Sequence, residues 1–348
     1  MRKSISVSIL LSLKLFSQAP EVKTAGQAYK NVTELKDIPA DQLGPAMQFI
    51  STSLGVQCDT CHVAGKFESD EKRPKKTARE MIAMTMAINK NAFRGQTQVT
   101  CYSCHRGSER PVAVPPVLDS DAPAKPEARP AAPANPPTAD SIIEKYVTAL
   151  GGPDAMKKVT SRVGKGAIVV SGKETPIEVF TKAPSKRITI THNEGSDSST
   201  AFDGTIGWMG STGRPAREMA PADAKGSALD SEFYLPLTMK EVFTQLRPGR
   251  PDKIGEVNVV TLTGTRQGLP PVRFFFDANS GLLVRMVRYT ENPLGRMPVQ
   301  IDYADYRDVD GVKTPFRWTL SRPNGRFTIQ LSEVKANVPI EDSKFAKP

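Results

Sequence analysis

Two copies of the motif Cys-x-x-Cys-His hold all four cysteines of this 348-residue chain and two of its three histidines. Two thiols three residues apart lie on one helical turn, so both can reach the vinyl edge of a porphyrin, and the next residue places an imidazole under the iron. This spacing is the attachment signature of c-type haem. We therefore predict two covalent haems. Their predicted thioether ligands are Cys58, Cys61, Cys101 and Cys104, and their predicted proximal iron ligands are His62 and His105.

Three other uses of paired cysteines explain the pattern less well. A four-cysteine zinc site usually has a central spacer of about 15–20 residues, whereas the pairs here lie roughly 40 residues apart and zinc leaves both histidines unexplained. A thioredoxin-like dithiol needs one pair beside a βαβ pattern, which the sequence lacks. Structural disulfides occur in exported proteins, but they require no histidine at a fixed offset.

The composition is that of a soluble protein with more than one core. A chain of this length with ordinary apolar content favours two domains. The net charge of +10 would suit an acidic partner or an anionic surface. Lysine and arginine are scattered, however, apart from a short cluster over residues 72–76. We expect a solvated basic face and no nucleic-acid-binding module.

The first 19 residues have the features of an export signal. Arg2 and Lys3 precede a short apolar run from Ile5 to Leu13, and residues 17–19 form a small-residue cleavage site. The apolar run is too short to span a bilayer. Covalent haem is attached outside the cytoplasmic membrane, which agrees with export. We predict a soluble periplasmic protein.

The remaining chain divides at a linker rich in proline and alanine. Residues 111–138 have little apolar periodicity, and such composition favours extended segments that bury no core. The linker separates a predicted dihaem cytochrome c domain at residues 20–110 from a β-rich domain at residues 139–348.

The haem region is predicted to be mainly helical, and its helices carry candidate sixth ligands for iron. One helix begins at Gly44-Pro45, ends at Gly55 and places Met47 on its apolar face. A second helix runs from Pro74 to about Asn91, and its expected inner stripe is Ala78, Met81, Ile82, Thr85 and Ile88. Methionine is the usual partner opposite histidine in electron-transfer cytochromes c. Met47 is the candidate for the first haem, and the second helix offers Met81, Met84 and Met86.

These segments resemble the haem-binding repeat of the photosynthetic reaction-centre cytochrome c subunit. The resemblance covers Met47–Ile50, Leu54–Cys58, Ala78–Asn89 and Val99–Gly107. It implies Met47 as the axial ligand of the first haem and Met81 as that of the second, with Met84 as the alternative on nearly the same helical face. The chain has two motifs where the purple-bacterial subunit has four haems, and it has no anchor cysteine. A role in photosynthesis therefore does not follow, and respiration is the alternative.

The second domain is predicted to form one large antiparallel sheet curved around helices, because its strands follow one another through tight turns. A helix capped by Asp140 and ended by Gly151-Gly152 precedes the strands, and short helices interrupt them near residues 239–246. The segments Phe202–Trp208, Phe275–Val284 and Asp305–Phe316 resemble the half-barrel of periplasmic lipoprotein-carrier and sorting proteins. That resemblance implies a concave face able to hold an acyl chain or another apolar ligand.

The β-rich domain offers weak candidates for catalysis. Its one histidine, His192, is expected in an exposed loop. Four aspartates, at positions 302, 305, 308 and 310, are expected to face solvent, with calcium binding as the alternative.

The predicted protein is thus multidomain, with a mainly α multihaem cytochrome c domain and an α+β domain built on a curved antiparallel half-barrel. Its predicted function is electron transfer through two His/Met-ligated haems to periplasmic redox proteins or a membrane-bound electron-transfer complex, without enzymatic activity. The alternative is a ligand- or partner-binding β module with the haems as a redox sensor. A peroxidase-like enzyme would need a vacant iron position, which Met47 and Met81 argue against.

Overall fold

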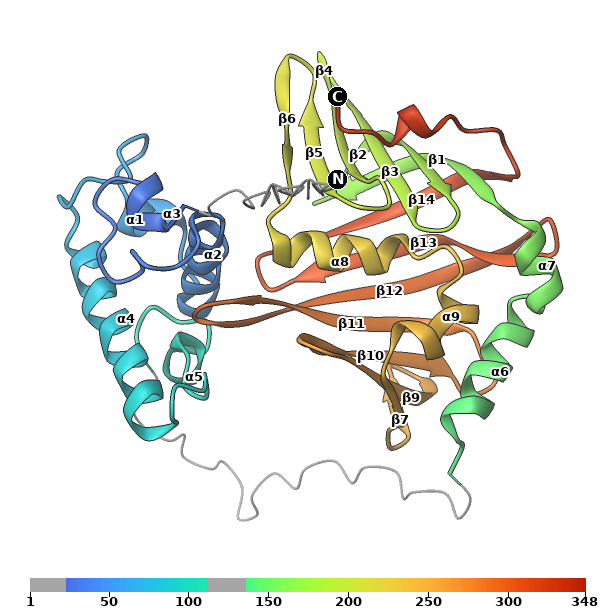
Figure 1. The fold of residues 1–348 in the computed structure, drawn as a ribbon, viewed down its shortest axis with the longest axis horizontal. Helices are drawn as coiled ribbons and strands as arrows, with labels where there is room; N and C mark the ends of the chain where they lie inside the picture. The colour runs from blue at the N-terminus through green and yellow to red at the C-terminus, as the bar shows by residue number, and fades with distance from the viewer. Residues whose placement is uncertain (1–22, 112–135) are drawn as a thin grey trace, which may run out of the picture.

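The computed structural model describes residues 23–111 and 136–348. Residues 23–111 form a helical body, which lies at one end of a larger sheet body formed by residues 136–348 (Figure 1). The predicted export signal at residues 1–19 and most of the predicted linker fall outside the described residues. Within the described ranges, no helix is long and apolar enough to cross a membrane.

The helical body alternates longer helices with the short turns that contain the cysteine motifs. Its elements are α1 (Ala25–Ala28), η1 (Ala40–Gln42), α2 (Leu43–Leu54), α3 (Cys58–Cys61), α4 (Arg73–Ala92) and α5 (Cys101–His105). Helix α2 ends where Gly55 adopts a left-handed conformation with φ 68°. Helix α4 begins with Pro74 in its first turn, where a missing N–H costs nothing. Both helices confirm the predicted positions.

The sheet body contains one open sheet of 14 antiparallel strands. The strands are β1 (Ser161–Val170), β2 (Lys173–Lys182), β3 (Lys186–Asn193), β4 (Ser196–Phe202), β5 (Gly207–Ser211), β6 (Arg214–Glu218), β7 (Gln245–Pro248), β8 (Asp252–Ile254), β9 (Val257–Arg266), β10 (Leu269–Asp277), β11 (Leu283–Asn292), β12 (Gly295–Val309), β13 (Val312–Arg322) and β14 (Gly325–Ala336). Their order is β6-β5-β4-β3-β2-β1-β14-β13-β12-β11-β10-β9-β7, and β8 pairs with β9. The β1–β14 pair joins the first and last strands of the body. The predicted large antiparallel sheet is confirmed.

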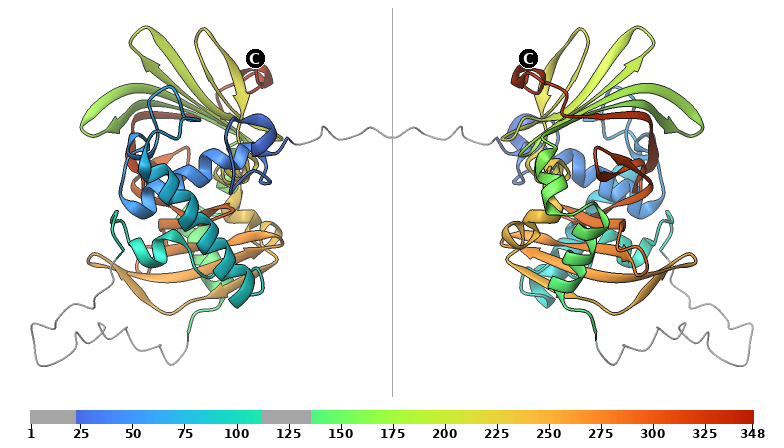
Figure 2. Two further views of the ribbon diagram at one scale, coloured as in Figure 1. Left: turned by 90° about the vertical axis from the view of Figure 1, so that its left-hand side faces the viewer. Right: turned by 90° about the vertical axis from the view of Figure 1, so that its right-hand side faces the viewer.

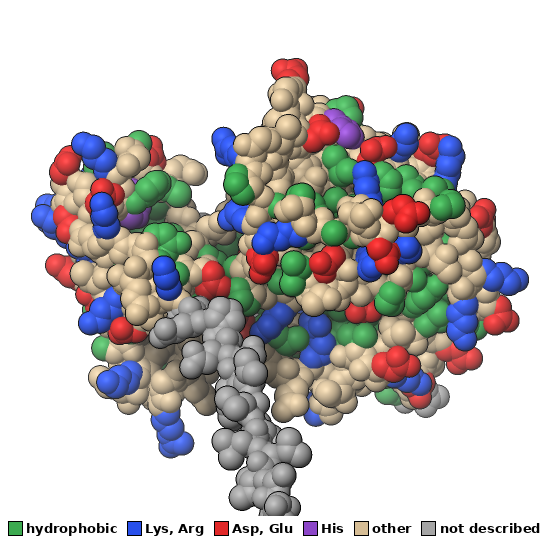
Figure 3. All heavy atoms as spheres, turned by 45° about the horizontal axis from the view of Figure 1, so that its top comes forward, with side chains coloured by type: hydrophobic (Ala, Val, Ile, Leu, Met, Phe, Trp, Pro, Cys, Tyr) green, Lys and Arg blue, Asp and Glu red, His purple; other side chains and the backbone are tan. Residues whose placement is uncertain are grey.

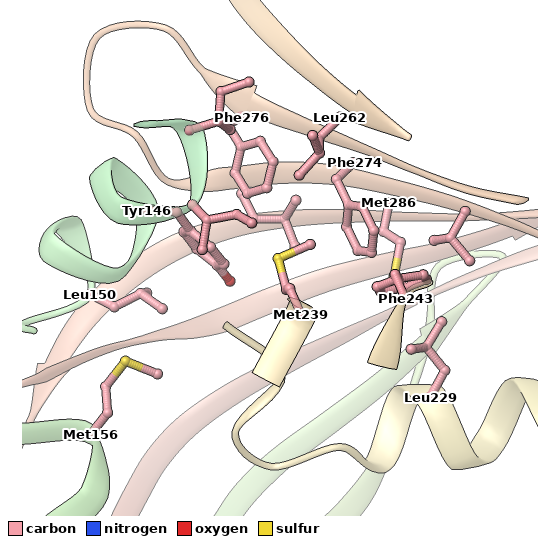
Figure 4. Packing of buried hydrophobic residues seen from close by; sticks show 14 of the residues in the cluster. Tyr146, Leu150, Met156, Leu229, Met239, Phe243, Leu262, Phe274, Phe276 and Met286 are labelled. Atoms are coloured by element: carbon pink, nitrogen blue, oxygen red, sulfur yellow. The ribbon is translucent and has the colours of Figure 1, made fainter. Parts of the chain in front are cut away.

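Helices cover the inner face of this sheet, which curls strongly when viewed from the side (Figure 2). They are α6 (Ala139–Ala149), α7 (Pro153–Lys158), α8 (Pro221–Ser231) and α9 (Leu235–Val242), and a short η2 (Asp342–Lys344) follows the last strand. Met239 of α9 and Phe243 just after it point into a packed layer with Phe274 and Phe276 of β10 (Figure 4). Met239 is 1% exposed. An acyl chain on this face would therefore have to displace side chains that already fill it.

Two local predictions in the sheet body are wrong. Thr138, not Asp140, caps α6, because the Thr138 Oγ1 accepts a hydrogen bond from Ser141 N at 3.1 Å. His192 lies within β3 rather than in a loop, and its ring is near two carboxylates. The His192 Nδ1 is 3.2 Å from Asp197 and its Nε2 is 3.6 Å from Glu178.

The turn between β11 and β12 makes the packing contact between the sheet body and the helical body. This turn, residues 292–297, is called the docking hairpin and reaches α2 (Figure 1). A buried apolar cluster spans the contact and comprises Leu35, Ala46, Phe49, Ile50, Ile82, Leu294 and Met297. At Gly295 a β-carbon would lie 2.5 Å from Phe49 Cζ. Only glycine therefore allows the hairpin to approach α2 this closely.

Charged side chains of both signs are mixed over the molecular surface. On the face shown in Figure 3, lysine and arginine are interspersed with aspartate and glutamate over both bodies. Basic residues on this face are therefore solvated but interspersed with acidic ones, and no separate basic face is seen in this view.

Candidate haem-attachment site

Each cysteine motif forms a single helical turn. In α3 the His62 N–H donates to the Cys58 carbonyl at 3.0 Å, and the preceding Gln57 is extended. In α5 the turn begins after an extended Thr100, whose N–H donates to Ser103 Oγ at 3.0 Å. All four cysteines are free thiols. In both motifs the paired thiols share one helical turn, as thioether attachment requires.

Both motif histidines make the same kind of hydrogen bond. The His62 Nδ1 lies 3.1 Å from the Phe67 carbonyl oxygen, and the His105 Nδ1 lies 3.0 Å from the Ser108 carbonyl oxygen. A carbonyl oxygen only accepts, so these bonds place the proton on Nδ1 and leave the lone pair of Nε2 available to a metal. The repeated arrangement suits two proximal iron ligands.

An ion-pair network fixes the loop that follows the first motif. Lys75 donates from its buried ammonium to the carbonyls of Phe67 and Ser69, both at 2.9 Å. Asp70 lies 3.0 Å from Lys75 Nζ and 2.9 Å from Arg79 Nη1. The hydrogen bond from Arg79, with others from Asn31 and Lys75, holds the pKa of Asp70 well below its usual value. The loop is thereby tied to the first two turns of α4.

A buried asparagine fixes the segment before the second motif. Asn89 of α4 accepts from the backbone N–H groups of Gln98 and Val99 at 3.0 and 2.9 Å, and its side-chain amide donates to the Val99 carbonyl at 2.7 Å. These three bonds satisfy the backbone two residues before Cys101. This role was not predicted from the sequence, and its signal is an asparagine seven residues after Ile82, on the buried face of α4.

The two motifs belong to one packed unit. The Gly107 N–H, just after α5, donates to the Ser53 carbonyl of α2 at 2.9 Å. A β-carbon at Gly55 would clash with the Gly107 backbone, so the end of α2 and the second motif are in close contact. Burial and the nearby Glu109 raise the pKa of the Cys61 thiol, which places the segment after the second motif near the first.

The candidate methionine ligands occupy different environments. Met47 is half-buried against the cluster shared with the docking hairpin. Met81, Met84 and Met86 are 37%, 46% and 44% exposed. The predicted inner stripe of α4 is therefore wrong at Met81, because the buried positions are Lys75, Ile82, Thr85 and Asn89. Met81 and Met84, three residues apart, share one flank of α4, and Met86 lies on another.

The helical body presents an unusual amount of exposed apolar surface. Its exposed large apolar side chains are Tyr29, Phe67, Met81, Met84, Met86, Phe93 and Tyr102. Contiguous exposed apolar side chains mark a binding surface, and Met81 and Met84 are neighbours on one flank of α4. Beside two Cys-x-x-Cys-His turns with correctly oriented histidines, that surface fits the flat apolar faces of haem.

Other metal sites find no support in the described ranges. No group of three or more His, Cys, Asp or Glu side chains there is placed to hold a metal ion. Asp302 pairs with Arg285 at 2.5 Å, Asp305 pairs with Arg307 at 2.7 Å, and Asp308 accepts from a backbone N–H. Asp305, Asp308 and Asp310 are exposed, as expected, and Asp302 is half-buried. In the described ranges these carboxylates do not come together as a ligand set for calcium.

The motif turns and their histidines have the geometry that attachment of a c-type haem requires. Residues 12–151 match the model of the photosynthetic reaction centre cytochrome C subunit family. The reaction-centre cytochrome c subunit of Thermochromatium tepidum is 35% identical over 91 residues, which cover 25% of this chain and 22% of that protein. Its counterpart from Roseobacter denitrificans is 33% identical over 113 residues, 28% of this chain and 30% of that protein. The predicted resemblance to this family is confirmed. The matched segment covers less than a third of the length of either relative.

Solved structures resemble the sheet body at low sequence identity. A putative outer membrane lipoprotein-sorting protein domain from Vibrio parahaemolyticus has a TM-score of 0.44 and 11% identity, covering 60% of this chain and 96% of that one. A LolA superfamily protein from Nitrosomonas europaea has a TM-score of 0.41 and 15% identity, covering 61% of this chain and 98% of that one. The second predicted resemblance is therefore also found.

Proposed function

We propose that this protein is a periplasmic dihaem c-type cytochrome that transfers electrons and is not an enzyme. The observation that carries the proposal is the duplicated arrangement in which each motif histidine donates its Nδ1 proton to a backbone carbonyl. Haem supplies one-electron oxidation and reduction at its iron. The chain holds the macrocycle through paired thiols, orients the imidazoles and covers the apolar faces.

The axial ligands are part of the same proposal. His62 and His105 would each supply Nε2 to an iron, and Met47 and Met81 would each supply a thioether sulfur, with Met84 as the alternative to Met81. A thioether raises the reduction potential relative to a second imidazole. Periplasmic redox proteins or a membrane-bound electron-transfer complex are the partners that this chemistry suits.

Haem stoichiometry tests the proposal most directly. Exported protein, produced with a haem-attachment system, is expected to show two haems per chain by pyridine haemochrome, and intact mass is expected to rise by two haems. Carbon monoxide added to the reduced protein is expected to leave the spectrum unchanged, because both irons are six-coordinate. One haem per chain would contradict the dihaem proposal, and ready carbon monoxide binding would favour an enzyme or gas sensor.

Replacing the proposed ligand of the first haem gives a second test. Met47→Ala is expected to open one iron to carbon monoxide and to lower one reduction potential, because the thioether that favours the reduced iron is lost. Met86→Ala is the matched control, since Met86 lies on a different flank of α4 from Met81 and Met84. An unchanged spectrum and unchanged potentials in Met47→Ala would exclude Met47 as a ligand.

The sensor alternative is favoured by one cavity where the two bodies meet. A cavity of about 200 Å³ is lined by Gln42 of η1 and, from the sheet body, by three cationic residues and one acidic residue: Lys225, Arg266, Arg288 and Glu291. Arg288 is paired with Asp230 at 2.6 Å, so within the described residues Lys225 and Arg266 provide the unpaired positive charge that exceeds that of Glu291. Its cationic lining suits a small carboxylate. If the sheet body reports ligand binding to the haems, adding acetate, a small probe carboxylate, would shift a haem potential. Constant potentials across an acetate titration would favour simple electron transfer.

A further inference from the structure

The Phe67 carbonyl oxygen accepts two hydrogen bonds, one from a motif histidine and one from a buried cation. His62 Nδ1 lies 3.1 Å from this oxygen and Lys75 Nζ lies 2.9 Å from it. Lys75 is only 8% exposed. The ammonium is therefore within about 6 Å of the imidazole, with little water to screen its charge.

We propose that Lys75 is a positioning residue that sets the reduction potential of the first haem above that of the second, an inference that rests on the proposed dihaem function. An electron-rich imidazole stabilises oxidised iron, and a strong hydrogen bond from Nδ1 makes it electron-rich. Lys75 draws electron density from the shared carbonyl, so the bond to His62 Nδ1 weakens. The positive charge also stabilises the reduced state directly. Both effects raise the potential.

The second motif lacks this feature. His105 Nδ1 donates to the Ser108 carbonyl at 3.0 Å, and within the described residues no side chain makes a second hydrogen bond to that oxygen. Both histidines thus donate a hydrogen bond from Nδ1 to a backbone carbonyl oxygen. The two carbonyl oxygens differ in whether a lysine side chain also donates to them. This difference predicts two distinct potentials from two nearly identical attachment turns.

The charges next to Lys75 do not cancel its effect on the reduction potential. One of them, Asp70, also offers a substitution that should shift the potential in the opposite direction. Asp70 lies against both Lys75 and Arg79, so one carboxylate faces two cations and a net positive charge remains. Removing Lys75 would leave Asp70 with Arg79 alone and cancel that net charge. Removing the charge of Asp70 would instead strengthen the cation field at the Phe67 carbonyl.

The test is a set of four variants of the full haem-loaded protein, compared by potentiometric titration. Paramagnetic NMR would assign the ring protons of His62 and His105 and so identify each haem. Lys75→Met is expected to lower the potential of the first haem and Asp70→Asn to raise it. Lys75→Arg keeps the charge and is expected to restore the wild-type potential. Lys76→Met is the matched control, because Lys76 is the exposed neighbour on the same helix.

For Lys75→Met the ratio of oxidised to reduced first haem at a fixed solution potential is expected to rise roughly threefold to tenfold, and tenfold is about 59 mV for one electron. Shifts of opposite sign in Lys75→Met and Asp70→Asn would support the proposal, since loosening of the loop alone would move both in one direction. Two bound haems with unchanged or equally shifted potentials in both variants would overturn it. Wild-type protein without two haems would instead refute the proposed function.

Discussion

Asn89 is expected to be the main determinant of stability in the segment before the second motif. Asn89→Ala removes three hydrogen bonds and leaves the Val99 N–H and the Val99 carbonyl without partners, whereas the Gln98 N–H keeps its bond to the Gln96 carbonyl at 2.9 Å. A neutral hydrogen bond contributes about 1 kcal/mol, and an unsatisfied buried group costs about 1–3 kcal/mol. Because the segment is half-buried and water can reach part of it, we expect a loss of about 2–4 kcal/mol in the unfolding free energy of the helical body.

Asn91→Ala is the matched control for this substitution. Asn91 is exposed on the same helix, so both variants gain the same helix propensity and only Asn89→Ala loses buried hydrogen bonds. Urea unfolding followed by far-ultraviolet circular dichroism reports the helices. Fluorescence reports the sheet body, since both tryptophans, Trp208 and Trp318, lie in its strands. Equal stability of the two variants would refute the assigned role of Asn89.

Two further predictions concern the docking hairpin and acid stability. Gly295→Val is expected to separate the two bodies, because its side chain would overlap Phe49, and small-angle scattering should show a larger radius of gyration. Gly325→Val in the β13–β14 turn has open space at this position and should leave the radius unchanged. Asp70 has a lowered pKa in the folded protein, so the stability it adds is present above about pH 3.9 and is lost as pH falls below that value. The difference in melting temperature between wild type and Asp70→Asn should therefore shrink on acidification, and a constant difference would contradict the assignment.

Helix positions could be predicted where an apolar period and its boundary residues are both local in sequence. Helix α2 has an apolar face and a terminal glycine, Gly55, and α4 starts at Pro74. These signals need no information about the rest of the fold. The antiparallel sheet could be predicted for the same reason, since alternating apolar residues and tight turns are also local signals.

Elements without an apolar pattern could not be predicted. Strand β6 (Arg214–Glu218) has no buried residue, and helix α8 (Pro221–Ser231) is rich in small and polar residues. Both form because the sheet already provides a neighbouring strand or face to pair with or to cover. The secondary-structure propensity of these two segments is weak, so tertiary contacts decide which structure they form.

In the proposed haem site, the candidate ligands follow from the sequence motif, whereas the residues that orient them could not be predicted from the sequence. The cysteines and histidines follow from the motif. The carbonyls of Phe67 and Ser108 lie in irregular loops. Which carbonyl accepts the hydrogen bond from each histidine depends on the backbone path of the loop, which the sequence does not specify. Lys75 looked like part of an exposed basic cluster, and its burial depends on the path of the loop it binds.

The docking hairpin determines how much of the protein has its helical body docked on the sheet body and how much has the two bodies separated. The two bodies belong to one chain, so their effective concentration for each other is about millimolar. A dissociation constant of about 1 mM corresponds to about 4 kcal/mol. Burial of two apolar side chains supplies about 1.5–3 kcal/mol each, and Leu294 and Met297 are both buried in this contact. The two side chains thus supply about 3–6 kcal/mol, close to the roughly 4 kcal/mol that docking requires, so the docked arrangement is only marginally favoured. A partner that competes for the hairpin tip would therefore release the helical body at modest energetic cost.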